Sequence, residues 1–242
     1  MKKFGTVSLF VTILYLIHGN NLLAGDSHEM LQPFEAVYRI EGWGVVEIQR
    51  TVTLSYDAPI YKMSLVNEVT GLASLTGYGP IVEESQFKLM LGSIKPIVYS
   101  NIDQSEISHL HDSIQFDWES GLARSQRKEE RFIFPVEVGV LDPITVELSV
   151  RRDLIAGRPY DTYLVHDVEQ IRTFQVSRLD NVTIDTELGS FEAIHLIIDT
   201  GRTSRLLHYW LAPDISYLPV QIIQYHNGKV EVQATIQKLS LK

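Results

Sequence analysis

Apolar and polar residues alternate along the segment from Val46 to Tyr56. One face carries Val46, Ile48, Arg50, Val52, Leu54 and Tyr56, and the other carries Glu47, Gln49, Thr51, Thr53 and Ser55. A period of two is typical of a half-buried β-strand, because successive side chains point to opposite faces of a sheet. Arg50 alone interrupts the apolar face.

The C-terminal region carries the clearest hairpin signal, at Asn227-Gly228. These two residues accept the positive φ angles of a type I′ turn, which joins two antiparallel strands through a two-residue loop. The expected register pairs Tyr225 with Val230 and Ile223 with Val232. It also predicts one shared buried face, made of Val230, Val232, Ala234 and Ile236.

Two further turns are predicted from Gly-containing breaks between apolar runs. Ser120-Gly121 separates 114–118 from 122–127, and Leu188-Gly189-Ser190 precedes the apolar run 191–198. The Gly-rich segment 71–80 reads as a long loop between strands.

One segment has a helical pattern instead. Asp142 is the expected N-cap, Pro143 the first helical residue and Gly157 the stop, which gives a helix of about 14 residues. The fold class is therefore mainly β: an antiparallel, strongly curved sheet or incomplete β-barrel with one short helix.

The run 191–198 is apolar on both faces. Ile194, Leu196 and Ile198 oppose Phe191, Ala193 and Ile197, and His195 joins the second set. Such a strand is either covered on both sides or lines a cavity for an apolar ligand.

The N-terminus resembles a secretory signal peptide. Lys2 and Lys3 precede an apolar run of about 11 residues, too short for a membrane span, and cleavage after Ala24 is expected. Residues 1–24 are thus expected to be removed, leaving 25–242 as a single exported β-rich domain. No second long apolar segment follows, so we predict no transmembrane segment in the mature chain and a periplasmic location.

Composition excludes several classes of protein. The chain has no Cys, which excludes disulfides and lipid attachment through an N-terminal cysteine.

The formal charge of the chain is −9, and it becomes −11 when Lys2 and Lys3 are removed, since −9 − 2 = −11. An acidic protein lacks the clustered cations that bind phosphate backbones, so nucleic acid is an unsuitable partner. The bases of 124–131 are interleaved with Glu129 and Glu130 and read as a solvated strand or turn, the alternative being a small contact with anionic lipid.

Candidate chemical groups are few. His109 and His111, with Asp103 and Asp117 nearby in sequence, have the spacing of metal ligands on one face of a strand, the alternative being an exposed polar strand end. His195 is expected to be a core histidine, and His208 beside Tyr209 and Trp210 belongs either to packing or to a ligand site.

The members of the pairs Glu83-Glu84 and Glu129-Glu130 point to opposite faces of a strand, so neither pair flanks one scissile bond. No nucleophile or phosphate-binding motif occurs. We therefore assign no catalytic, cofactor-binding or metal-binding residue and no cofactor.

The C-terminal third carries the residues of a family resemblance. These are Leu188-Gly189-Ser190-Phe191, then Tyr209-Trp210-Leu211-Ala212-Pro213-Asp214, then Tyr217-Leu218-Pro219-Val220. With the Tyr38 strand, Phe116-Asp117-Trp118 and Asp142-Pro143 upstream, the chain resembles the exported bacterial proteins grouped as domain of unknown function 3108. The resemblance implies a β-rich fold and a place in the envelope of a Gram-negative bacterium, and it brings no known reaction. By itself the Trp210 motif reads as a structural corner, with its ring buried and Pro219 near a strand start or edge.

Three functional hypotheses remain open. The first is a non-enzymatic periplasmic envelope protein that binds or chaperones a lipid or another apolar envelope component on the concave face of its sheet. The second is a scaffold or interaction protein of an envelope assembly that uses exposed strand edges. The third is a hydrolase acting on cell-wall glycan or lipid. The expected partners are thus a lipid or an envelope protein.

Overall fold

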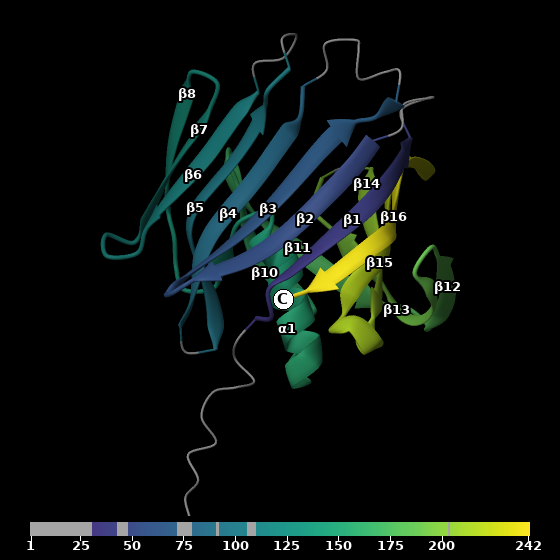
Figure 1. The fold of residues 1–242 in the computed structure, drawn as a ribbon. Helices are drawn as coiled ribbons and strands as arrows, with labels where there is room; N and C mark the ends of the chain where they lie inside the picture. Colours follow the sequence, from purple (N-terminus) through teal and green to yellow (C-terminus); the bar gives the residue numbers. More distant parts are fainter. Residues whose placement is uncertain (1–30, 43–47, 72–78, 91, 106–109, 203) are drawn as a thin grey trace, which may run out of the picture. The chain divides into compact units, whose positions relative to one another are not determined.

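The computed structural model describes residues 31–42, 48–71, 79–90, 92–105, 110–202 and 204–242 (Figure 1). Most of these residues belong to strands. In chain order the elements of the described residues are β1 (Phe34–Gly42), β2 (Ile48–Asp57), β3 (Ile60–Val69), β4 (Ile81–Met90), β5 (Ser93–Asp103), β6 (His111–Asp117), β7 (Leu122–Arg127), β8 (Glu130–Pro135), β9 (Val140–Leu141), α1 (Thr145–Ala156), β10 (Thr162–Asp167), β11 (Gln170–Arg178), β12 (Val182–Thr186), β13 (Gly189–Asp199), β14 (Arg205–Ala212), a 3-10 turn (Pro213–Ile215), β15 (Leu218–His226) and β16 (Lys229–Leu241).

The strands form one continuous, unclosed sheet. Its order is β8-β7-β6-β5-β4-β3-β2-β1-β16-β15-β14-β13-β11-β10-β9, and β12 pairs with β13 beside this path. Neighbouring strands are antiparallel except β9 and β10, which are parallel. Parallel strands need a long crossover connection, and helix α1 supplies it. The expected curved antiparallel sheet with one helix is confirmed.

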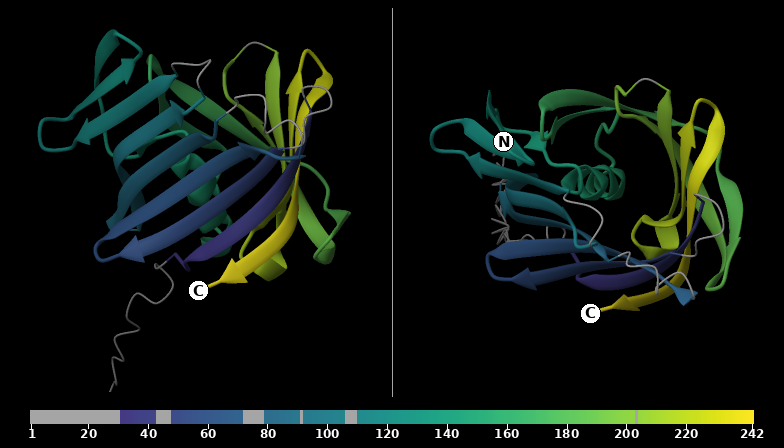
Figure 2. Two further views of the ribbon diagram at one scale, coloured as in Figure 1. Left: turned by 45° about the horizontal axis from the view of Figure 1, so that its top comes forward. Right: turned by 90° about the horizontal axis from the view of Figure 1, so that it is seen from above.

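Helix α1 lies on the concave side of the sheet (Figure 2). Arg152 donates from Nη1 to the Gly92 carbonyl oxygen at 2.9 Å, which ties the helix to the turn between β4 and β5. Arg151 donates from Nε and Nη2 to the Ser216 carbonyl oxygen, each at 3.3 Å, which ties it to the opposite half of the sheet. Between these anchors Leu148 is completely buried. The helix therefore fills part of the hollow and forms a core with both halves of the sheet.

The helix begins later than the sequence pattern predicts. It starts at Thr145, with Pro143 and Ile144 in a preceding turn. Asp142 still caps this first turn, because its Oδ1 accepts hydrogen bonds from the Ile144 and Thr145 amides at 2.9 and 2.8 Å. At the other end Gly157 has φ 62°, a left-handed conformation that glycine adopts at helix ends, so the predicted stop is confirmed.

The C-terminal hairpin is confirmed at its turn and corrected in its register. Asn227 and Gly228 have φ 50° and 73°, and Tyr225 pairs with Val230. A bulge then shifts the ladder, so that Val232 pairs with Gln224 and not with Ile223. A bulge adds one residue to a strand and reverses the side on which the following residues lie. Val230 is therefore 54% exposed and does not share the buried face of its strand.

Two other predicted turns are confirmed, and one predicted loop is only partly described. The Ser120-Gly121 turn connects β6 to β7, and the Leu188-Gly189 turn connects β12 to β13. Within the loop 71–80, residues 72–78 lie outside the described residues, as do Val46 and Glu47 of the first predicted strand.

Strand β13 is apolar on both faces and is covered more completely on its concave face. Leu196 on the concave face and Ala193 on the other face are both fully buried. The β12–β13 hairpin lies across the convex side of β15 and β16, where Glu187 accepts from Arg39 and Gln237. The concave face of the strand is therefore covered, whereas Phe191, His195 and Ile197 on its convex face stay partly exposed.

The corner motif has the structural role expected from its residues. Trp210 is 8% exposed at the end of β14, and the 3-10 turn that contains Pro213 follows it. Pro219 lies near the start of β15, next to a bulge, and its carbonyl oxygen accepts a 2.9 Å hydrogen bond from Tyr38 Oη. The corner therefore also fixes β1 against β15.

Asp142 generates a prediction about pH. This side chain is fully buried and accepts a 2.5 Å hydrogen bond from Ser85 Oγ, and burial raises its pKa to about 6. Between about pH 4 and pH 6 the Asp142 carboxyl is therefore protonated in the native protein and ionised in the unfolded chain. The free energy of unfolding consequently falls as pH rises through this window, by up to about 3 kcal/mol. We expect Asp142→Asn to remove this loss while keeping the cap.

Urea unfolding at pH 4.5 and pH 7 measures this difference. The exposed Asp180→Asn is the matched control and should retain the wild-type pH dependence. An Asp142→Asn protein that loses as much stability as wild type between the two pH values would contradict the assignment.

Candidate functional site

Charged and hydroxyl-bearing side chains gather inside the hollow, where a core normally has apolar residues. We call this set the interior cluster; its members are Tyr38, Arg50, Glu83, Tyr99, Glu147, Arg151 and Tyr209. They come from β1, β2, β4, β5, α1 and β14, which surround the hollow. Tyr38, Arg50 and Glu147 line one small cavity. Tyr209 interacts electrostatically with Glu147, Arg50 and Glu83, so the members form one neighbourhood.

Several side chains of the interior cluster form hydrogen bonds within the protein. Arg50 Nε donates to Asn67 Oδ1 at 2.7 Å, and Tyr99 Oη donates to Glu83 Oε1 at 2.6 Å. Arg151 bonds to the carbonyl oxygen described above and lies over the Phe34 ring at 5.1 Å. These bonds hold the side chains in position.

The remaining groups of the interior cluster have no partner among the described residues. They are the Glu147 carboxylate, the Tyr209 hydroxyl, the two terminal amino groups of Arg50 and Nη1 of Arg151. No ion pair within 4.0 Å joins the four charged members, all of which lie in the described ranges. Charged groups taken out of water without such partners are unfavourable for folding.

The electrostatics of the cluster agree with this geometry. Burial raises the pKa of Glu147, and nearby Arg151 and Arg50 only partly offset that effect. Burial likewise raises the pKa of Glu83, against the hydrogen bond from Tyr99. Glu147, Glu83 and Tyr209 are nevertheless partly exposed to water. These three side chains are therefore surrounded by protein and still reached by solvent, as expected of residues that line a hollow.

The two sides of Arg50 differ. On one side the hollow is filled by protein, and on the other side its walls carry apolar side chains. On the filled side the cavity beside Phe34 has a volume of about 10 Å³, room for about one water molecule. On the other side, the next inward-facing positions of the strands are apolar and partly exposed. We call them the apolar rim: Ile48, Val69, Leu207 and Val232.

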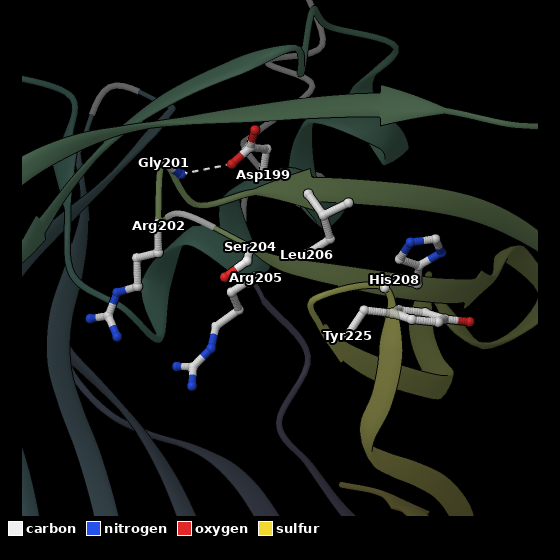
Figure 3. Close-up of a pocket in the computed structure, with 9 residues that line it drawn as sticks. Asp199, Gly201, Arg202, Ser204, Arg205, Leu206, His208 and Tyr225 are labelled. Atoms are coloured by element: carbon white, nitrogen blue, oxygen red, sulfur yellow. Dashed lines mark hydrogen bonds between the residues drawn. The ribbon is translucent and has the colours of Figure 1, made fainter.

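A second concavity lies on the opposite face of β14, and we call it the outer pocket (Figure 3). Its volume is about 520 Å³, within the usual range for small-molecule sites. Its lining includes Asp199, Arg202, Arg205, Leu206, His208 and Tyr225. Because side chains alternate along β14, Leu206 and His208 lie outside while Tyr209 lies inside.

Rings form one wall of the outer pocket. His195 Nε2 and His208 Nδ1 share a hydrogen bond of 2.9 Å, and the His195 ring stacks on Trp210 with centroids 4.3 Å apart. The centroid of Tyr225 lies 4.6 Å from that of His208. Burial lowers the pKa of both histidines, and His195 lowers that of His208 further, so the neutral form of both rings is favoured.

The structure changes the interpretation of both histidines. His195 was expected in the core, but it is partly exposed on the convex face of β13, although one of its nitrogens has the expected partner. His208 lines the outer pocket, so its aromatic neighbourhood belongs to a candidate ligand site as well as to packing.

The four residues considered as metal ligands are only partly described by the structure. His109 lies outside the described residues, and His111 is exposed at the start of β6. Asp117 caps a turn by accepting from the Ser120 amide at 3.1 Å. In the ranges that the structure describes, no group of three or more His, Asp or Glu side chains is placed to hold a metal ion.

The carboxylate pair Glu83-Glu84 separates as the strand pattern predicts. Glu83 points inward to Tyr99, whereas Glu84 forms an ion pair with Lys62 at 2.6 Å on the other face.

Sequence reasoning did not find the interior cluster as a site. One signal was present: Arg50, the single charge on the apolar face of its strand, lies in the hollow beside Tyr38 and Asn67. Glu147 and Tyr209 gave no comparable signal, because a helical glutamate and a strand tyrosine are common on exposed faces.

Comparison with known proteins gives a family and a fold. The family model described as "Protein of unknown function (DUF3108)" matches residues 34–235, from β1 into β16. The chain belongs to the DUF3108 family. Comparison with curated proteins finds no match. One similar solved structure is described as the crystal structure of a beta-barrel-like protein of domain of unknown function DUF1849 from Brucella abortus. It is 11% identical, with a TM-score of 0.53 over 88% of this chain and 98% of that chain, which shows a shared fold.

No helix within the described residues is long and apolar enough to cross a membrane.

The interior cluster generates a prediction about stability. Glu147→Gln removes a carboxylate that burial disfavours, so we expect the free energy of unfolding at pH 7 to rise by about 1 kcal/mol, with a melting temperature about 2–4 °C higher. The gain should shrink as pH falls, because the wild-type carboxyl then also becomes neutral. Thermal unfolding followed by circular dichroism measures it, with the exposed Glu119→Gln as control. A Glu147→Gln protein less stable than wild type at pH 7 would show that the carboxylate has a structural partner.

Proposed function

We propose that this DUF3108 protein is an exported, non-catalytic envelope protein that binds an amphiphilic envelope component in the hollow of its sheet. The polar head of the ligand contacts the interior cluster, and its apolar part lies along the apolar rim. The observation that supports this most strongly is the set of unpaired polar groups of Arg50, Glu147 and Tyr209. These groups are partly buried and without a protein partner, and a bound polar group would supply one.

The charges of the interior cluster make a purely apolar ligand unsuitable. Hydrocarbon against Arg50 and Glu147 would leave two charges without water and without partners, at a cost of several kcal/mol. The described cavity next to Phe34 is also far too small for an acyl chain. The lipid hypothesis therefore takes a narrower form, in which the headgroup enters the hollow.

A zwitterionic head matches the cluster best. The two free amino groups of Arg50 suit a phosphate or carboxylate, because the guanidinium fork binds two oxygens at once. The Glu147 carboxylate suits an ammonium group. The Tyr209 hydroxyl both donates and accepts, so it can bond to either part of the head.

A second function is favoured by a different observation, the open edge of the sheet at β8. This strand has a partner only on the β7 side within the described sheet, and Ile133 on it is 64% exposed. An exposed edge strand can add a strand from another protein. A scaffold role in an envelope assembly is therefore the alternative proposal.

The first experiment is native mass spectrometry of the protein purified from the periplasm, followed by lipid extraction and identification. Titration with lysophosphatidylethanolamine, whose head is zwitterionic, then measures the affinity. Phosphoethanolamine supplies the head without a chain and a fatty acid supplies the chain without that head. We expect the complete amphiphile to bind at least about tenfold more tightly than either part.

Arg50→Leu should weaken lysophosphatidylethanolamine binding at least about tenfold, because it removes the charge-assisted hydrogen bonds to phosphate. Arg124→Leu, on exposed β7, is the matched control and should bind as wild type. Protein that carries no lipid from the periplasm and binds none of the three probes would refute the proposal and favour the scaffold. Equal binding by Arg50→Leu and wild type would refute the assigned site.

A further inference from the structure

The imidazole ring of His166 is buried without a hydrogen-bond partner. Its side chain is completely shielded from water near the end of β10, and neither Nδ1 nor Nε2 has a partner among the described residues. A neutral imidazole has one N–H donor and one acceptor nitrogen, so both groups lose their hydrogen bonds to water on folding. A phenylalanine would avoid this cost, so the histidine calls for an explanation.

His166 lies where the two ends of the open sheet meet. We call this region the seam; it consists of the contacts that β6, β7 and β8 make with β10 and the turn after it. The His166 ring packs edge to face against Phe116 of β6 and Phe134 of β8, with ring centroids 5.9 and 5.0 Å apart. No ladder of the described sheet joins these strands to β10. The ring therefore belongs to the packing that holds the two ends of the sheet together.

The other described contacts of the seam are made by side chains. Ser125 Oγ of β7 donates to the Val168 carbonyl oxygen at 2.5 Å, and Arg127 Nη1 lies 2.7 Å from Glu169 Oε2. Arg127 is 30% exposed, so water already reaches one end of the seam. A few contacts of this kind separate at lower free energy than a backbone ladder.

The charged groups around the ring are engaged with one another. Those on its own strand, in the turn after it, on the neighbouring β11, and on the faces of β6, β7 and β8 that carry Phe116, Ser125 and Phe134 are Asp167, Glu169, Arg172, Asp112, Arg127 and Glu130. Asp112 accepts from Arg127, and Asp167 accepts from Arg172 and Arg202. Asp167 favours the charged form of His166, but burial has the larger effect and lowers the pKa of the ring to about 4.

We propose that His166 makes the seam an acid-sensitive gate, in which protonation of the ring separates β6, β7 and β8 from β10 and opens the hollow at this side. A charged imidazole has two N–H donors, which find no partner in the closed seam and are hydrated by water in the open one. The ladders on either side of the seam stay paired. The inference concerns the protein alone, so it does not depend on which ligand the hollow binds.

The direction of the pH effect follows from the lowered pKa. In the open seam the ring has the ordinary pKa of histidine, near 6.5, so the open form takes up a proton before the closed form does. Opening is therefore favoured as pH falls from about 6.5 to about 4. Between pH 7 and pH 4.5 the equilibrium constant for opening should rise about 50-fold.

A single cysteine in the seam measures this opening, because the natural chain has no Cys. Ser125→Cys places a thiol where the buried hydroxyl lies. Its rate of reaction with 2,2′-dithiodipyridine, which attacks thiols at acidic pH as well, is divided by the rate for the urea-unfolded protein at the same pH. We expect this ratio to be about 50-fold larger at pH 4.5 than at pH 7.

Three further variants make the test specific. His166→Phe in the Ser125→Cys protein keeps an aromatic ring and removes the titration, so the ratio should change less than about threefold between the two pH values. His111→Phe in the same protein replaces an exposed histidine of β6 and should keep the full change. Ala234→Cys, buried in β16, reports unfolding of the wall and should stay protected at pH 4.5. Asp142, which titrates in the same range, is present in every one of these proteins and cancels in the comparison.

Three results would overturn the proposal. They are equal protection of Ser125→Cys at both pH values, the same rise in reactivity with His166→Phe, and an equal rise at Ala234→Cys, which would indicate unfolding of the whole protein. If circular dichroism shows that His166→Phe does not fold, nuclear magnetic resonance of the wild-type ring decides. A titration midpoint below about pH 5 supports the gate, and one near pH 6.5 contradicts it. None of these measurements involves lysophosphatidylethanolamine, so this proposal and the proposed function fail separately.

Discussion

The position of helix α1 inside the curved sheet is the constraint on which the rest of the molecule depends. The helix is attached to one half of the sheet through Asp142 and Arg152, and to the other half through Arg151. Each attachment joins a side chain to a partner far away in sequence. Such bonds are formed only when both halves of the sheet have closed around the helix, so they link the curvature of the sheet to the packing of the core. They also bring Glu147 opposite Arg50, and so create the interior cluster.

The presence of charge in that cluster is best understood as a conflict between folding and function. A helix that fills a hollow is most stable with apolar side chains on every inward position, as at Leu148. Glu147 departs from this rule on the helix, and Arg50 departs from it on β2. Neither charge forms an ion pair within 4.0 Å, so mutual compensation does not explain them. Charged residues at positions that favour apolar side chains, where the charge does not increase the stability of the fold, are expected at binding sites.

Much of the fold follows from the sequence because the sheet is built from local patterns. Alternation predicted β2, Asn227-Gly228 predicted the last turn, and Gly157 predicted the helix end. The predictions are wrong where a single residue shifts a strand register or a helix boundary. The bulge beside Tyr225 changes the pairing of β15 with β16, and Pro143 lies before the helix. The candidate sites were harder to predict, because each depends on strands distant in the chain. His208 is notable in the sequence for its aromatic neighbours, but Arg202 of the same pocket belongs to the turn before β14, whose placement no local pattern shows.

The sheet does not close on itself, so its two ends meet along a seam that lacks the backbone hydrogen bonds of the rest of the wall. Within the walls, neighbouring strands are joined by continuous ladders. Where β6, β7 and β8 approach β10 and the turn after it, the contacts in the described residues include a 2.5 Å hydrogen bond from Ser125 to the Val168 carbonyl oxygen, an ion pair between Arg127 and Glu169, and packing of the buried His166 ring against Phe116 and Phe134. A seam of a few side-chain contacts opens at lower free energy than a ladder of backbone bonds. We therefore expect the width of the hollow to be held less firmly at this seam than along the strand ladders.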